Sequence, residues 1–89
     1  MLFMAVYSYA PERRDEVLKR RMEKGSLIPA GIKTLGEWSY LGFGRVFRLY
    51  EVDDPAVAIQ AAHAWSDLGK IEVFPVIETD KLIALTKKK

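Results

Sequence analysis

The chain of 89 residues is one domain, and at this length folding buries only about 60 to 65% of the surface that the unfolded chain exposes, so the core is marginal. Hydrophobic residues make up 49% of the sequence, more than one small core readily buries, which indicates a partner subunit. The formal net charge of only +2 disfavours nucleic-acid binding, and the absence of cysteine excludes disulfides and thiolate chemistry.

The first predicted element is a strand over residues 2–9, in which apolar side chains occupy both faces. A strand of this kind is covered on both sides. The same stretch lacks a basic leader and is too short to cross a bilayer, so we expect a cytoplasmic protein without a membrane segment.

A helix is predicted to begin near Pro11, which suits a first turn, and to end at Gly25, which suits a C-terminal cap. Its apolar stripe is narrow and consists of Val17, Leu18 and Met22. The helix therefore covers one sheet face, and its basic residues are interpreted as solvated surface.

A second strand over residues 32–39 and a third over residues 44–52 form a predicted hairpin. The predicted register places Trp38 opposite Val46 and Gly36 opposite Arg48, so that Trp38 and Arg48 share a face. A cation in a central strand requires an ion pair, a hydrogen-bonding partner, an aromatic ring or a ligand. Gly36 indicates a bulge or a close approach to the backbone.

The second helix is predicted from Asp54, as N-cap, to Leu68, with Gly69 as the C-terminal cap. A fourth strand follows over residues 71–77, and Pro75 within it indicates a sheet edge. Residues 79–85 predict a short terminal helix. Residues 1–86 are assigned to one domain, and residues 87–89 to a disordered basic tail.

This order of elements predicts a ferredoxin-like α+β fold, βαββαβ, with two helices on one face of a four-stranded antiparallel sheet. The other face of the sheet is also apolar, and nothing in the chain is left to cover it. We therefore expect a homodimer that packs sheet face against sheet face.

His63 and Asp67 are the candidate groups for proton transfer, because a spacing of four residues on a helix lets a carboxylate orient an imidazole. The alternative interpretation is an ordinary polar pair on a helix surface. One histidine and no cysteine argue against a metal site, and neither a metal nor another cofactor is expected.

Several aromatic residues are expected inside the fold, where they either line a pocket for a flat ligand or simply form the core. These candidate ligand-binding residues are Tyr7, Tyr9, Trp38, Phe47 and Trp65.

RNA binding is a remote alternative. Residues 42–46 and 2–4 are similar to the two short motifs of RNA-recognition domains, which share this topology and stack bases on strand aromatics. However, Leu41 stands where that motif has a cation, and Arg45 and Arg48 stand where it has aromatics.

A resemblance to a known family rests on residues spread over nearly the whole chain: Gly36 to Trp38, Gly42 to Arg45, Glu51, Asp53 to Pro55, Trp65 to Leu68, Pro75 and Val76. In these residues the sequence resembles a prokaryotic family of domains of unknown function, the one numbered 3303. The resemblance implies membership of the dimeric α/β barrels, in which two ferredoxin-like subunits join their sheets. Relatives in that superfamily include cofactor-free monooxygenases, lactone isomerases, haem-degrading enzymes and ligand-sensing modules. The haem-degrading relatives use an asparagine, which this sequence lacks.

Two functions therefore stay open. One is a dimeric module that binds a small apolar or aromatic molecule between sheet and helices. The other is a cofactor-free oxygenase or isomerase, in which Arg48 holds an anionic or enolate oxygen, His63 with Asp67 moves a proton, and Trp38 and Trp65 enclose the ligand.

Overall fold

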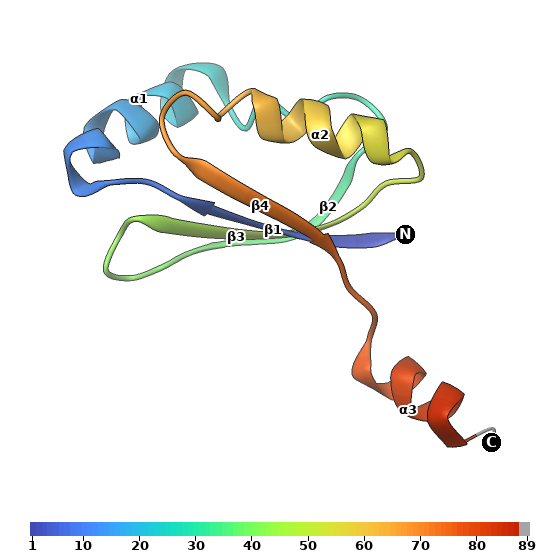
Figure 1. Ribbon diagram of the computed structural model, residues 1–89. Helices are drawn as coiled ribbons and strands as arrows, with labels where there is room; N and C mark the ends of the chain where they lie inside the picture. The colour runs from blue at the N-terminus through green and yellow to red at the C-terminus, as the bar shows by residue number, and fades with distance from the viewer. Residues whose placement is uncertain (88–89) are drawn as a thin grey trace.

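The computed structural model describes residues 1–87. Its element order confirms the predicted βαββαβ arrangement and adds a terminal helix (Figure 1). The elements are β1 (Leu2–Ser8), a short 3-10 turn (Pro11–Arg13), α1 (Arg14–Lys24), β2 (Lys33–Ser39), β3 (Arg45–Glu51), α2 (Pro55–His63), β4 (Lys70–Pro75) and α3 (Thr79–Lys87).

The four strands form one antiparallel sheet in the order β2-β3-β1-β4, which is the ferredoxin-like topology. Both α1 and α2 lie on one face of this sheet, which we call the helix face, and the opposite face is called the open face (Figure 1). No helix among residues 1–87 is long and apolar enough to cross a membrane. Of the predicted basic tail, Lys87 belongs to α3, and residues 88–89 lie outside the described part of the chain.

The helix boundaries follow local capping chemistry. The side chain of Asp54 accepts a hydrogen bond of 2.9 Å from the backbone N–H of Ala56, and Pro55 occupies the first turn of α2. At the end of α1, Gly25 adopts a φ of 70°, a conformation that glycine reaches without steric cost. Both predicted caps are thereby confirmed.

Helix α2 ends at His63 rather than at the predicted Leu68. Beyond His63 the chain continues in tight turns, and two of its carbonyls bind tertiary partners. The carbonyl of Ala64 accepts from Arg20, and that of Trp65 accepts from the hydroxyl of Tyr7. These long-range contacts compete with the helical hydrogen bonds. The local sequence pattern does not reveal them, so it predicted too long a helix.

The core lies between the helix face and the helices in two adjoining clusters. One contains Phe3, Ala5, Tyr50, Val52 and Ala58, and the other contains Tyr7, Tyr9, Val17, Trp65 and Leu68. Apolar residues at every second position of β1 therefore supply both clusters, as the period of a strand requires.

The predicted register of the β2-β3 hairpin is wrong by one residue. Trp38 pairs with Phe47, and Glu37 pairs with Arg48. The loop runs from Leu41 to Gly44, between the hydrogen-bonded residues on either side, and is one residue longer than the predicted register requires. Because neighbouring residues of a strand face opposite sides, this shift places Trp38 and Arg48 on opposite faces of the sheet.

Both features predicted at Gly36, a bulge and a close approach to the backbone, are present in the structure. The register shifts between Thr34 and Gly36, as in a β-bulge, and the indole ring of Trp38 lies over Gly36 so closely that a Cβ atom there would collide with it.

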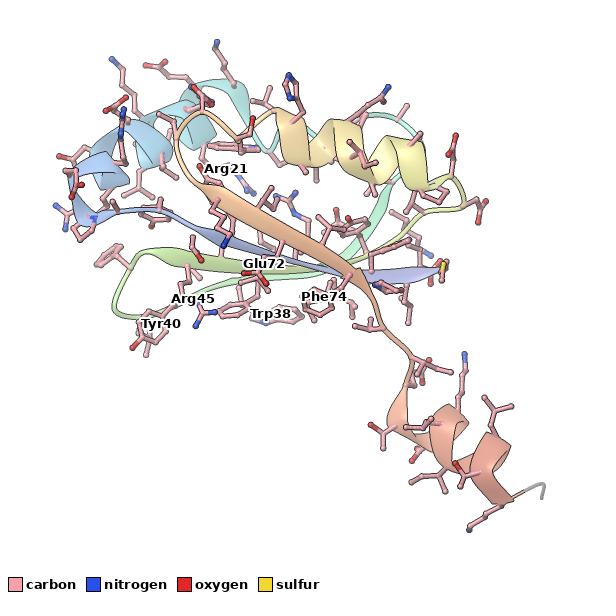
Figure 2. The ribbon with its side chains drawn as sticks, in the orientation of Figure 1. Arg21, Trp38, Tyr40, Arg45, Glu72 and Phe74 are labelled. Carbon is pink, nitrogen blue, oxygen red and sulfur yellow. The ribbon has the colours of Figure 1, made fainter. Side chains whose placement is uncertain are left out.

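The middle of the open face carries two rows of cross-strand neighbours. One row consists of Trp38, Phe47, Val6 and Glu72, and the other of Leu49, Met4 and Phe74. Trp38 is 57% exposed and Phe74 is 41% exposed, and Figure 2 shows both on the side of the sheet away from α1 and α2. No element among residues 1–87 covers this face.

Helix α3 confirms the predicted terminal helix, but it packs against none of the other described elements. It lies on the open-face side of the sheet, away from α1 and α2 (Figure 1). Its apolar residues Leu82, Ile83 and Leu85 are all exposed.

Candidate functional site

A pocket of about 260 Å³ lies between the helix face and α1. Most of its wall is apolar or aromatic. The residues that form this part of the wall are Ala5, Tyr7, Tyr9, Val17, Leu18, Val46, Trp65 and Ile71.

The polar part of the pocket is an ion-pair network built from three elements. Glu37 of β2 accepts hydrogen bonds from Nε and Nη2 of Arg48 on β3, the first 3.1 Å long. Arg21, which extends from α1 toward the sheet in Figure 2, contacts the other carboxylate oxygen of Glu37 at 2.8 Å. Arg48 thus has the partner that a cation in a central strand requires.

Glu37 is held in its ionised form by these two arginines. Burial by itself would raise its pKa, but the hydrogen bonds from Arg21 and Arg48, together with their charges, lower the pKa of Glu37 below its ordinary value. The network therefore consists of two cations and one anion.

The aromatic part of the pocket is held in place by hydrogen bonds. The hydroxyl of Tyr7 donates to the carbonyl of Trp65 at 3.0 Å, and the indole N–H of Trp65 donates to the carbonyl of Ser26 at 3.0 Å. The two rings meet edge to face with centroids 5.9 Å apart. Burial, and next the charge of Asp67, raise the pKa of Tyr7 to about 12, so this hydroxyl stays protonated at neutral pH.

The structure brings four of the predicted site residues together and separates the others. Tyr7, Tyr9, Trp65 and Arg48 line the pocket. Trp38 and Phe47 belong to the open face, so they cannot enclose a ligand in this pocket together with Trp65.

The predicted hydrogen bond between His63 and Asp67 is replaced by another contact. Both carboxylate oxygens of Asp67 accept hydrogen bonds of 2.7 Å from Arg20. Those hydrogen bonds lower the pKa of Asp67 to about 2. His63 is the exposed last residue of α2 and does not line the pocket.

Sequence reasoning missed Arg21, Glu37 and Ser39, which all line the pocket. Arg21 was interpreted as part of a solvated basic face, because a helical wheel does not reveal a carboxylate on a distant strand. Glu37 could have been found from the hairpin alone, since a register shifted by one residue places it opposite Arg48.

Within residues 1–87, no cluster of three histidine, aspartate or glutamate side chains has the geometry to hold a metal ion. The carboxylate inside the pocket is already neutralised by arginines. Guanidinium groups repel cations, so the pocket itself suits an organic ligand better than a metal.

The family described as "Domain of unknown function (DUF3303)" matches residues 1–89, and the chain belongs to this family. The resemblance inferred from the sequence is thereby confirmed. No curated protein matches the sequence. Among solved structures, the crystal structure of a candidate antibiotic biosynthesis monooxygenase from Deinococcus radiodurans is similar. The two chains are 15% identical, the alignment covers 86% of this chain and 92% of that one, and the TM-score is 0.48.

Proposed function

We propose that this member of the DUF3303 family binds a small apolar or aromatic molecule in the pocket between the sheet and α1, and that it does so as a homodimer. The observation that supports ligand binding is the cavity of about 260 Å³ with an aromatic wall and one charged corner. Ligand sites combine a mostly apolar wall with a few placed polar groups in this way.

The pocket is preformed, which separates it from an ordinary packing defect. Tyr7 and Trp65 are each fixed by a hydrogen bond to a backbone carbonyl, so their rings cannot readily move inward to fill the space. Its volume lies below the roughly 300 to 1,000 Å³ of sites for drug-sized ligands. A molecule of one or two rings fits such a volume.

The open face supports the homodimer. Trp38 and Phe74 expose large apolar surfaces there, beside Phe47, Leu49 and Met4. A contiguous apolar patch of this kind marks an interaction surface, and a two-fold axis lets the same patch cover itself. Two sheets stacked about 10 Å apart would bury both patches.

Helix α3 provides independent support for a second copy on that side. An isolated helix of nine residues is marginal in water, and α3 packs on no other described element. Because it projects on the open-face side, its exposed residues Leu82, Ile83 and Leu85 are available to a partner subunit seated there (Figure 1).

A cofactor-free oxygenase or isomerase is the second candidate. It is favoured by Arg48, a half-buried cation beside an apolar cavity, which is suited to holding an enolate oxygen. The roles of His63 and Asp67 in proton transfer stay predictions, as does a cytoplasmic location.

Native mass spectrometry of the untagged protein as purified tests the proposal directly. We expect a dimer that retains an organic mass, with the retained mass lost in Arg48→Gln and kept in Arg13→Gln. Arg13 is a matched control because, within residues 1–87, its ion-pair partner is Glu16 on the exposed surface of α1 and its preceding turn. Conversion of the retained compound during incubation would favour the enzyme. A monomer would contradict the proposed homodimer. A protein that binds no one- or two-ring compound would contradict the proposed ligand binding.

A further inference from the structure

The polar corner of the pocket holds more hydrogen-bond donors than acceptors. Arg48 uses Nε and Nη2 on Glu37, and Nη1 makes no hydrogen bond to residues 1–87. Arg21 uses only Nη1 on Glu37. The hydroxyl of Tyr9 also makes no hydrogen bond within the described chain, whereas the hydroxyl of Tyr7 is engaged by Trp65. The unused donors of Arg48 and Tyr9 are not sealed from solvent, and the side chain of Arg21 is 44% exposed, so all three residues are accessible from solvent.

The same corner carries an excess of positive charge. The pocket lining contains the cations Arg21 and Arg48 and a single carboxylate, Glu37. The side chain of Arg48 is 14% exposed and that of Glu37 is 22% exposed, so water screens these charges less than it screens surface ions. Together the three groups carry one excess positive charge, and water screens the charge of Arg21 more strongly because its side chain is 44% exposed.

Glu37 limits where a ligand anion can bind. It occupies the Nε and Nη2 edge of Arg48 and one Nη group of Arg21, and it holds both guanidinium groups at the pocket. A guanidinium has five N–H donors in a rigid plane, so the remaining donors of both arginines stay oriented. The pocket is thus preorganised to bind the anionic group of a ligand while Glu37 keeps its own contacts with both arginines.

We propose that the ligand of this pocket is a compact aromatic acid, whose carboxylate or comparable oxyanion binds the donors of Arg48 and Arg21 that Glu37 leaves free. Its ring packs between Tyr7, Tyr9 and Trp65. This inference rests on the proposed ligand-binding function and adds the chemical class of the ligand. An inorganic anion would meet the same arginines but would leave the aromatic wall unused.

The test compares acids with uncharged molecules of nearly the same shape. Binding of benzoate and 1-naphthoate to the wild-type protein is measured by isothermal titration calorimetry beside benzamide and 1-naphthamide, with inorganic phosphate as the non-aromatic anion. Hydrogen bonds to charged groups contribute enough that each acid should bind about ten- to a hundredfold more tightly than its amide. Higher salt should weaken the acids and leave the amides unchanged.

The outcomes test two claims separately: that the pocket binds a small aromatic molecule, and that this molecule is an acid. Equal affinities of acid and amide would overturn the anion inference and leave small-molecule binding intact. Phosphate binding as tightly as 1-naphthoate would replace the aromatic acid by an inorganic anion. Absence of binding by every aromatic compound would overturn both. In Arg48→Gln the preference for the acid should fall to below about threefold while the amide still binds, and Arg13→Gln should keep the full preference.

Discussion

Arg20 of α1 and Asp67 of the loop before β4 form a two-pronged ion pair, with both hydrogen bonds 2.7 Å long. The guanidinium of Arg20 also lies 5.6 Å from the ring centre of Trp65 and donates to the carbonyl of Ala64. One arginine thereby connects the helix that covers the pocket to the segment that supplies an aromatic wall.

The pair makes stability depend on pH in the acid range. Because Arg20 lowers the pKa of Asp67 from 3.8 to about 2, the contribution is complete above pH 4 and is lost as the pH falls toward 2. Thermal unfolding of the wild type and Asp67→Asn should therefore differ at pH 7 and converge in that window. Asp15→Asn, at an exposed pair with Arg14, is the control and should change little. A difference between the wild type and Asp67→Asn that does not vary with pH would contradict the assignment.

The raised pKa of Tyr7 leads us to expect that stability also depends on pH in the alkaline range. Its pKa is raised from 10.0 to about 12, so the stability that the neutral phenol provides is present below pH 10 and is lost as the pH rises toward 12. Tyr7→Phe should lose about 1 kcal/mol at pH 7, because the carbonyl of Trp65 loses its hydrogen bond, and this deficit should shrink at alkaline pH. Urea unfolding at pH 7 and pH 11 measures both effects. Tyr40→Phe changes an exposed tyrosine and should be neutral; an equal loss there would rule out the proposed cause.

The two tryptophans of the chain report on the two faces of the sheet separately. In Trp38→Phe, the remaining Trp65 lines the pocket, so its emission should change when benzoate is added. In Trp65→Phe, the remaining Trp38 lies on the open face, so acrylamide should quench it less as the protein concentration rises and dimers form. If benzoate perturbs Trp38 instead, the ligand binds the open face. Circular dichroism confirms that each variant is folded.

A charge at the centre of the open face should dissociate the proposed homodimer. Leu49 lies in the row that includes Met4 and Phe74, and a lysine there would bring two like charges together across the two-fold axis. Leu49→Lys should sediment as a monomer in analytical ultracentrifugation. Ile59→Lys places the same change on the exposed surface of α2 and should leave the dimer intact. A dimeric Leu49→Lys protein would show that the interface lies elsewhere.

Local sequence signals predicted the elements and their order, because each such signal acts within a few residues. The alternation of apolar residues in β1, the N-cap Asp54 and the C-cap Gly25 specify their elements wherever the rest of the chain lies. The same signals correctly indicated an apolar sheet face that no helix within residues 1–87 covers. Four residues of the candidate site were predicted from the sequence: Tyr7, Tyr9 and Trp65 as inward-facing aromatics, and Arg48 as a cation in a central strand that needs a partner or ligand.

The tertiary structure alone decided which charged groups meet. A loop one residue longer than predicted brought Glu37 beside Arg48 on the helix face and placed Trp38 on the open face. Asp67 pairs with Arg20 rather than with His63, because a guanidinium offers a carboxylate two parallel hydrogen bonds and an imidazole does not. Such pairings depend on register and on contacts between distant segments. The sequence therefore determined the scaffold and most of the aromatic wall, and tertiary packing determined the electrostatics of the pocket.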